Sequence, residues 1–141
     1  MDKPVMDNLE YGHEWLQFAE NDLRSANNLM THYPIHIEVV VYLCQQSAEK
    51  SLKGLLVVNN VQPPKIHDLL ELLELCSGFG LEESLVNKQC AFLNQYSVSP
   101  RYPHEIAVSE NDLKMALEYA KTVLEVTKAL HPQDSKIREL Q

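Results

Sequence analysis

The chain has 141 residues, of which 45% are hydrophobic and only four are glycine, and its formal net charge is −8 at pH 7. This length fits a single domain with a packed core, and the abundance of Leu, Ala, Glu, Lys and Val favours helix. The excess of acidic residues excludes non-specific attraction of nucleic acid over the whole surface, so phosphate binding would require a local basic site.

The first predicted element is an amphipathic helix from about Asp7 to His32. Apolar side chains recur there at helical spacing, and Pro34 ends the pattern. The predicted core stripe consists of Leu9, Leu16, Ala19, Leu23, Ala26 and Met30, widened by Trp15 and Phe18. We expect residues 1–6 to form a loose terminus, and residues 1–12 hold no apolar segment typical of a signal peptide.

The second predicted helix, from about residue 35 to residue 60, carries the first candidate site. Its apolar face consists of Ile37, Val41, Cys44, Ala48, Leu52 and Leu55. Its opposite face is polar and consists of Gln46, Glu49, Lys50 and Lys53 at positions i, i+3, i+4 and i+7. This face is either a solvated surface with an intrahelical Glu49–Lys53 ion pair, or a cationic, amide-rich patch that holds a phosphate and a base.

The third and fourth predicted helices are shorter. Asp68 and Glu71 have the spacing of a capping box, which places the start of the third helix at Asp68, and two glycines at residues 78 and 80 end it. His67 precedes this cap and is expected to bond the backbone at the start of the helix. The fourth helix spans about residues 82–97, with an inward face of Leu85, Phe92, Leu93 and Tyr96.

The fifth predicted helix begins at Ser109 and Asp112 and ends before His131-Pro132. Its apolar face consists of Leu113, Leu117, Ala120, Leu124 and Thr127. Short connections between helices imply antiparallel neighbours, so the sequence predicts an all-α, up-and-down antiparallel bundle of about five helices. A single domain would cover residues 7–131, and residues 132–141 would form a polar, mobile tail.

The segment between the fourth and fifth helices holds the second candidate site, Ser99-Pro100-Arg101-Tyr102-Pro103-His104. The two prolines restrict the backbone and present Arg101 and Tyr102 in a fixed way. A guanidinium held like this can grip a phosphate or carboxylate with its planar fork. The alternative is a buried structural pair between Arg101 and a helix carboxylate, such as Asp22 or Glu49.

Several kinds of site find no support in the sequence. His32 and His36 are four residues apart, but Pro34 interrupts the helix that would align them, and no metal-binding spacing of His or Cys occurs. No glycine-rich phosphate loop and no nucleophile motif is present, so no metal, cofactor or complete catalytic set is predicted. The three cysteines, Cys44, Cys76 and Cys90, lie in apolar segments and are expected to be buried, reduced thiols of a cytosolic protein. No apolar run is long enough to span a membrane.

Four short segments, in this order, resemble the HEPN family of helical "higher eukaryotes and prokaryotes nucleotide-binding" domains. They are residues 19–26 (AENDLRSA), 45–56 (QQSAEKSLKGLL), 67–69 (HDL) and 101–103 (RYP). The resemblance implies a bundle of about five helices that commonly forms homodimers. It also implies a cytosolic bacterial or archaeal protein, often paired with a minimal nucleotidyltransferase in a toxin–antitoxin system.

Some members of this family are metal-independent ribonuclease toxins that use an Arg followed four to six residues later by a His. In this chain those offsets from Arg101 fall on Glu105, Ile106 and Ala107, and His104 comes three residues after Arg101. The motif is absent, and Arg101 and His104 are the remaining candidates for catalysis, as phosphate-binding cation and base.

The sequence therefore favours a nucleotide-binding and protein-interaction domain without catalytic activity. Arg101 would contact the phosphate, Tyr102 would stack on the base or shape the pocket, and Lys50 and Lys53 would add positive charge beside Gln46 and Glu49. A ribonuclease toxin or its degenerate relative is one alternative, and a purely structural dimerisation module is another. No membrane partner is expected.

Overall fold

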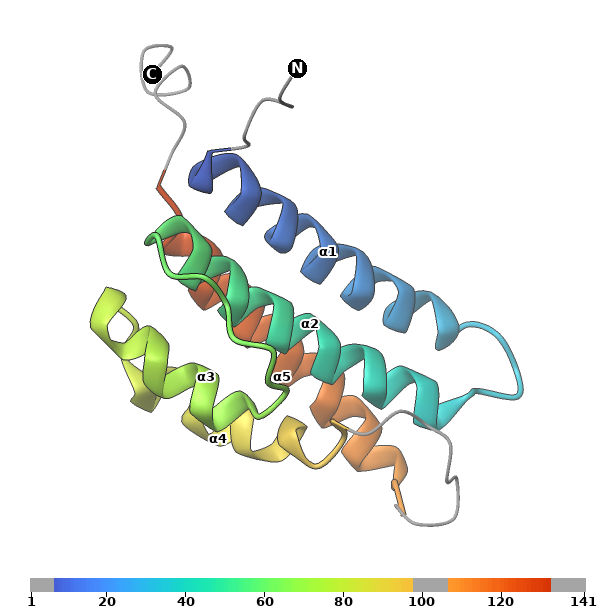
Figure 1. Cartoon of the computed structure of the whole chain (residues 1–141). Coiled ribbons are helices and arrows are strands. Elements are labelled where there is room, and N and C mark those ends of the chain that lie inside the picture. Colours follow the sequence, from blue (N-terminus) through green and yellow to red (C-terminus); the bar gives the residue numbers. More distant parts are fainter. Residues whose placement is uncertain (1–6, 98–106, 133–141) are drawn as a thin grey trace.

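The computed structural model describes residues 7–97 and 107–132, and in these ranges it contains helices and no strand. The helices are α1 (Asn8–Leu29), α2 (Ile37–Val58), α3 (Leu69–Cys76), the 3-10 turn η1 (Ser77–Phe79), α4 (Glu83–Asn94) and α5 (Glu110–Ala129). They form the all-α bundle of Figure 1, which confirms the predicted fold class.

Helix α2 lies at the centre of the bundle and contacts α1, α3, α4 and α5. Helix α1 runs antiparallel along one side of α2, while the α3–α4 pair and α5 cover its other sides (Figure 1). The alternation of directions is interrupted once. Residues 59–68, a turn followed by an extended stretch, run back along α2, so that α3 points in the same direction as α2 (Figure 1). We call this the return segment.

Side-chain caps define where three of the helices begin. The Asp7 carboxylate accepts a hydrogen bond from the backbone N–H of Glu10, and the Asp68 carboxylate accepts from the N–H groups of Leu70 and Glu71. Ser109 and Asp112 form a reciprocal capping box at α5. Each cap satisfies N–H groups that the first helical turn leaves without a carbonyl partner. The predicted caps of α3 and α5 are thus confirmed.

The core follows the predicted apolar stripes, but two side chains that we placed in it are exposed. Phe18 and Leu85 are 55% and 51% exposed. The buried face of α4 passes through Val86, Cys90 and Leu93, so the adjacent residue, Leu85, points about 100° away from the core. On α1 the buried stripe passes through Ala19, and the preceding Phe18 points outward for the same reason.

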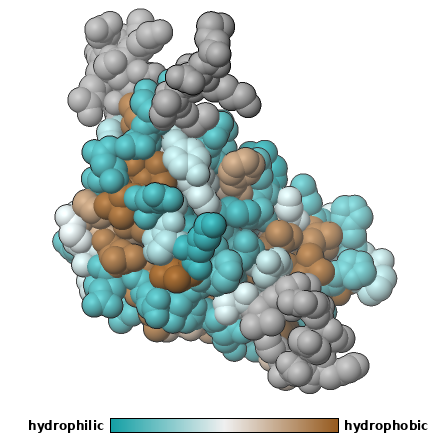
Figure 2. All heavy atoms as spheres, viewed as in Figure 1, coloured by the Kyte–Doolittle hydropathy of each residue, from teal (hydrophilic) through white to brown (hydrophobic). Residues whose placement is uncertain are grey.

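The surface is mostly hydrophilic in the view of Figure 2, with a hydrophobic patch on the α3 side of the molecule. The exposed large hydrophobic residues of α3 are Leu70 and Leu75. None of the helices described combines the length and the hydrophobicity needed to cross a bilayer.

The three thiols confirm the predicted buried, reduced cysteines. Cys44, Cys76 and Cys90 are free and fully buried. Burial raises the pKa of each thiol to about 12, because the thiolate would lose its hydration. These groups therefore remain protonated and unreactive at neutral pH.

Two glycines allow α1 and α2 to approach closely. A β-carbon on Gly54 would lie 3.1 Å from Cβ of Trp15 and 3.2 Å from the carbonyl oxygen of Gly12. A β-carbon on Gly12 would clash with Cγ1 of Val58 and lie 3.2 Å from the carbonyl oxygen of Gly54. The two helix backbones are therefore in contact at this crossing, and Trp15 is held against α2.

The end of α5 packs a histidine onto the same region. The ring of His131 stacks on that of His13 from α1, with centroids 5.8 Å apart, and its Cε1 atom lies 3.6 Å from the position of a Gly54 β-carbon. Neither ring nitrogen of His131 has a hydrogen-bond partner among the described residues. Burial first, and the neighbouring His13 second, lower the pKa of His131 from 6.5 to about 4.

We expect the protein to lose stability as the pH falls from 6.5 to about 4. In this window the unfolded chain binds a proton at His131 that the folded chain does not. The contribution of the neutral His131 ring to the free energy of unfolding is therefore fully present above pH 6.5 and is lost as the pH falls to about 4. His131→Phe should show a smaller fall in melting temperature across this window than the wild type. His36→Gln, which removes an exposed histidine, is the control and should follow the wild type. Parallel curves for the wild type and His131→Phe would contradict this assignment.

Candidate functional site

On the polar face of α2, Glu49 and Lys53 are buried and Gln46 and Lys50 are partly buried, so the first of the two alternatives, a solvated surface, is wrong. The predicted Glu49–Lys53 ion pair is present, at 3.1 Å between Oε2 and Nζ, but the two residues are only 5% and 6% exposed. The return segment causes this burial, because it runs along α2 and places His67 against Glu49 (Figure 1). Helical periodicity could not predict this burial, because it describes one helix and not the segment that packs against it.

Glu49 is the centre of a hydrogen-bonded group, which we call the Glu49 cluster: Gln45, Glu49, Lys53 and His67. Oε1 of Glu49 lies 3.0 Å from Nδ1 of His67 and accepts a longer bond of 3.4 Å from the Gln45 amide. The same Gln45 amide donates to the backbone carbonyl of His67 at 3.1 Å. The buried carboxylate thus has partners on both oxygens, as a buried charge requires.

The outcome for His67 differs from the sequence prediction. We expected its side chain to bond the backbone at the start of α3, but its ring bonds Glu49 and only its carbonyl oxygen takes part in a backbone contact. The ring is 68% exposed, whereas Glu49 is buried. His67 therefore attaches the end of the return segment to α2.

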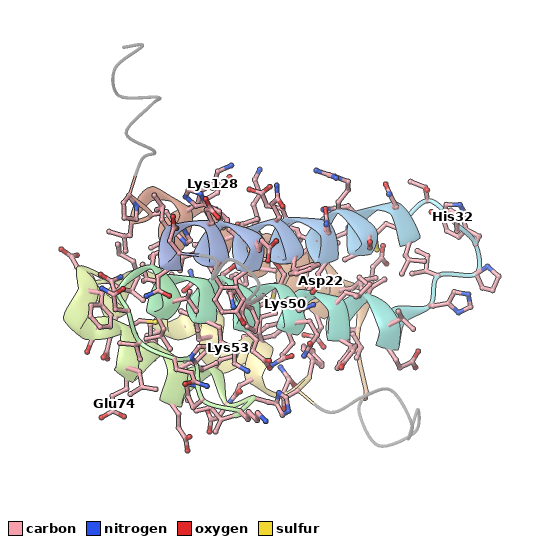
Figure 3. The ribbon with its side chains drawn as sticks, turned by 45° about the horizontal axis from the view of Figure 1, so that its top comes forward. Asp22, His32, Lys50, Lys53, Glu74 and Lys128 are labelled. Carbon is pink, nitrogen blue, oxygen red and sulfur yellow. The ribbon has the colours of Figure 1, made fainter. Side chains whose placement is uncertain are left out.

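The remaining polar residues of α2 do not all point toward the Glu49 cluster. Nζ of Lys50 bonds Oδ2 of Asp22 on α1 at 2.6 Å, so Lys50 faces α1 and not the return segment (Figure 3). Gln46 donates to Oε1 of Gln45 at 2.7 Å and thereby supports the Glu49 cluster. Of the two predicted lysines, only Lys53 lines the cavity described next.

Arg101, Tyr102 and His104 lie outside the described residues, so their predicted roles stay predictions. The two carboxylates that we considered as partners of Arg101 already have cationic or hydrogen-bonding neighbours. Asp22 pairs with Lys50, and Glu49 pairs with Lys53 and His67.

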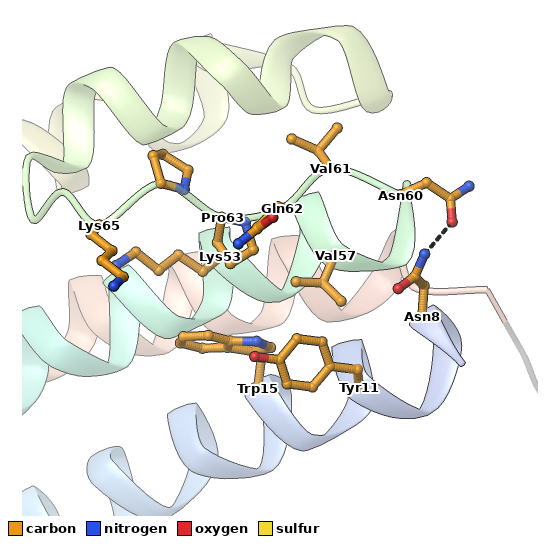
Figure 4. A pocket seen from close by; sticks show the side chains of 11 residues that line it. Asn8, Tyr11, Trp15, Lys53, Val57, Asn60, Val61, Gln62, Pro63 and Lys65 are labelled. Atoms are coloured by element: carbon orange, nitrogen blue, oxygen red, sulfur yellow. Dashed lines mark hydrogen bonds between the residues drawn. The ribbon is translucent and has the colours of Figure 1, made fainter. Parts of the chain in front are cut away.

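A cavity of about 510 Å³ opens between α1, the end of α2 and the return segment (Figure 4). We call it the Trp15 pocket. Tyr11 and Trp15 form its α1 side, with ring centroids 6.1 Å apart in an edge-to-face arrangement. The full lining consists of Asn8, Tyr11, Trp15, Lys53, Val57, Asn60, Val61, Gln62, Pro63, Pro64 and Lys65.

The two ends of the Trp15 pocket differ in character. Lys53 and Lys65 both line one end of the pocket, at the left of Figure 4. Nζ of Lys53 is 6.0 Å from the centroid of the Trp15 ring. At the other end the amide of Asn8 donates to Oδ1 of Asn60 at 2.5 Å, which joins the first turn of α1 to the return segment. The pocket therefore combines an aromatic wall, a cationic end and an amide-bearing end.

Sequence reasoning missed most of this pocket. It places Trp15 in the core stripe of the first helix, and it does not single out Tyr11 or Lys65. It interprets the prolines at 63 and 64 only as the end of the second helix, although proline also favours extended backbone of the kind seen in the return segment. Asn60, with φ of 65°, turns the chain into that segment. The Asn-Asn…Pro-Pro pattern could have indicated a turn followed by an extended segment.

Comparison with known proteins identifies the family. The family model described as "HEPN domain" matches residues 13–130. The chain belongs to the HEPN domain family. The resemblance deduced from four short segments is thereby confirmed, and the match runs from within α1 to the end of α5.

Two solved structures share the fold. The crystal structure of TT1696 from Thermus thermophilus is 26% identical, with a TM-score of 0.69 over 84% of this chain and 97% of that one. The crystal structure of ST0689, an archaeal HEPN homologue, is 22% identical, with a TM-score of 0.65 over 86% of this chain and 98% of that one. No curated protein matches the sequence.

Proposed function

We propose that this HEPN domain binds a nucleotide in the Trp15 pocket, with the base against Trp15 and Tyr11 and the phosphate beside Lys53 and Lys65. The observation that carries the proposal is that two aromatic rings and two lysine side chains line one open cavity. Aromatic faces stack on bases of any sequence, and ammonium groups attract phosphate. A volume of about 510 Å³ lies within the range of small-molecule sites.

The cationic end has the charge that a phosphate needs. Lys65 is exposed and forms no ion pair with the described residues. Lys53 is paired with Glu49, whose other oxygen bonds His67 and Gln45, so the net positive charge of this end comes from Lys65. This is a local basic site on a protein whose net charge is −8, which is what an acidic phosphate-binding protein requires.

The Glu49 cluster holds the cationic end in place. Its bonds fix Lys53 against the Trp15 ring and fasten His67, two residues after Lys65, to α2. Side chains held in this way lose little conformational freedom on binding, which favours affinity. At the other end, amide groups of Asn8, Asn60 and Gln62 offer donors and acceptors to a base or ribose.

Trp15 is the only tryptophan in the chain, so its fluorescence reports on this pocket. We expect AMP, ATP and GTP to quench it and to release or absorb heat in calorimetry. Lys65→Ala should weaken nucleotide binding about tenfold, because a charge-assisted contact to phosphate is lost. Lys114→Ala, at the opposite end of the bundle and 69% exposed, is the matched control and should bind as the wild type does. The absence of heat and quenching with every nucleotide, or equal affinities of the two variants, would refute the proposal.

A further inference from the structure

A second, smaller hollow adjoins the Trp15 pocket on the outer side of α1. It is lined by Tyr11, Glu14, Trp15 and Phe18 and has a volume of about 110 Å³. Tyr11 and Phe18 are 41% and 55% exposed. We call it the Phe18 hollow. It is far smaller than an independent ligand site, but it has room for a flat ring against aromatic walls.

The Phe18 hollow borders the Trp15 pocket. Both are lined by Tyr11 and Trp15, so the two rings separate one cavity from the other. Tyr11, Trp15 and Phe18 are spaced at i, i+4 and i+7 and therefore follow one face of α1. Neighbouring aromatic side chains along a surface are the arrangement on which successive bases of a single strand stack.

We infer that the Phe18 hollow is a second base subsite, so that the preferred ligand is a dinucleotide or a longer single strand rather than a mononucleotide. This inference rests on the proposed function of the Trp15 pocket. One base would stack in the Trp15 pocket, the connecting phosphate would pass the aromatic wall, and the next base would stack on Phe18.

The charge of the hollow specifies which base it accepts. Among the described residues that line it, Glu14 is the only charged one, and its carboxylate accepts hydrogen bonds and repels phosphate. It therefore suits the amino groups of guanine, cytosine or adenine, whereas uracil has no amino group and offers only an N3–H between two carbonyl oxygens that the carboxylate repels. The hollow is thus a site for the base and not for the phosphate of the second nucleotide.

Calorimetric titration of the full chain with AMP, the dinucleotide pApG and the dinucleotide pApU tests the inference. We expect pApG to bind about tenfold more tightly than AMP, because a second stacked base is added. Phe18→Ala should remove this advantage and leave the affinity for AMP unchanged. Leu85→Ala, which truncates a side chain of α4 with similar exposure, is the matched control and should have no effect. Glu14→Gln should reduce the preference for pApG over pApU.

The outcomes separate the two proposals. Equal affinities for AMP and pApG, unchanged by Phe18→Ala, would overturn the second subsite and leave the nucleotide site standing. Absence of binding by all three ligands would remove both. A dimer seen by sedimentation that Phe18→Ala dissociates, without an effect on pApG binding, would instead assign the hollow to a contact between copies of this chain.

Discussion

Replacing Glu49 with alanine is expected to destabilise the protein by about 3–5 kcal/mol, because it leaves the buried Lys53 ammonium without its counter-charge. His67 and Gln45 would lose their acceptor in the same change. Denaturant unfolding monitored by circular dichroism measures the difference. The effect is large because the cost of an uncompensated buried charge greatly exceeds the value of a surface ion pair.

The double variant Glu49→Leu/Lys53→Met distinguishes the charge effect from the loss of side-chain volume. It replaces both charges with apolar groups, and such replacements of buried pairs are often neutral or stabilising. We therefore expect it to recover most of the stability lost in Glu49→Ala, while nucleotide binding at the Trp15 pocket is weakened by the missing ammonium. If Glu49→Ala costs less than about 1 kcal/mol, the pair behaves as a solvated one and the buried-cluster interpretation is wrong.

Replacing Gly12 with alanine is expected to destabilise the protein by about 1–2 kcal/mol. The added methyl group clashes with Cγ1 of Val58 and lies 3.2 Å from the backbone carbonyl of Gly54, which forces α1 away from α2. Overpacking typically costs about 1–3 kcal/mol, and this overlap lies in the upper part of that range, at about 2–3 kcal/mol. The better helix propensity of alanine returns about 1 kcal/mol of it. The separation also moves Trp15 away from Lys53, so nucleotide affinity should fall as well.

Two controls make this prediction specific. Gly78→Ala adds a methyl group where nothing lies within 4 Å, and it should leave stability unchanged or slightly higher. In a Val58→Ala background, which removes the clashing Cγ1 atom, Gly12→Ala should cost less than half of its wild-type penalty, as measured in a double-mutant cycle. Equal penalties in both backgrounds would show that Val58 does not set the helix separation.

The Glu49 and Gly12 variants each change a contact that both stabilises the fold and shapes the Trp15 pocket. The Gly12–Gly54 crossing brings the aromatic wall of α1 to α2, and the Glu49 cluster brings the return segment to α2 from another direction. The Trp15 pocket lies between these two contacts. The packing of α1 and of the return segment on α2, and the shape of the pocket, therefore depend on the same residues.

The sequence by itself determined the helices, their order, their caps and the family. Helical periodicity is a local property, so the apolar stripes, the Asp68 cap and the Ser109–Asp112 capping box could be identified from neighbouring residues alone. The Glu49–Lys53 pair was predictable for the same reason, because residues four apart on a helix face each other.

Only the tertiary structure decided which polar residues are buried and which residues meet in a pocket. Glu49 and Lys53 have the spacing of a solvated pair, yet the return segment covers them, and Trp15 belongs to a core stripe, yet its ring borders a cavity with Lys65 fifty residues later in the chain. Local spacing specifies the direction of a side chain on its own helix. It does not specify which distant segment lies opposite, because that depends on the path of residues 59–68 across α2.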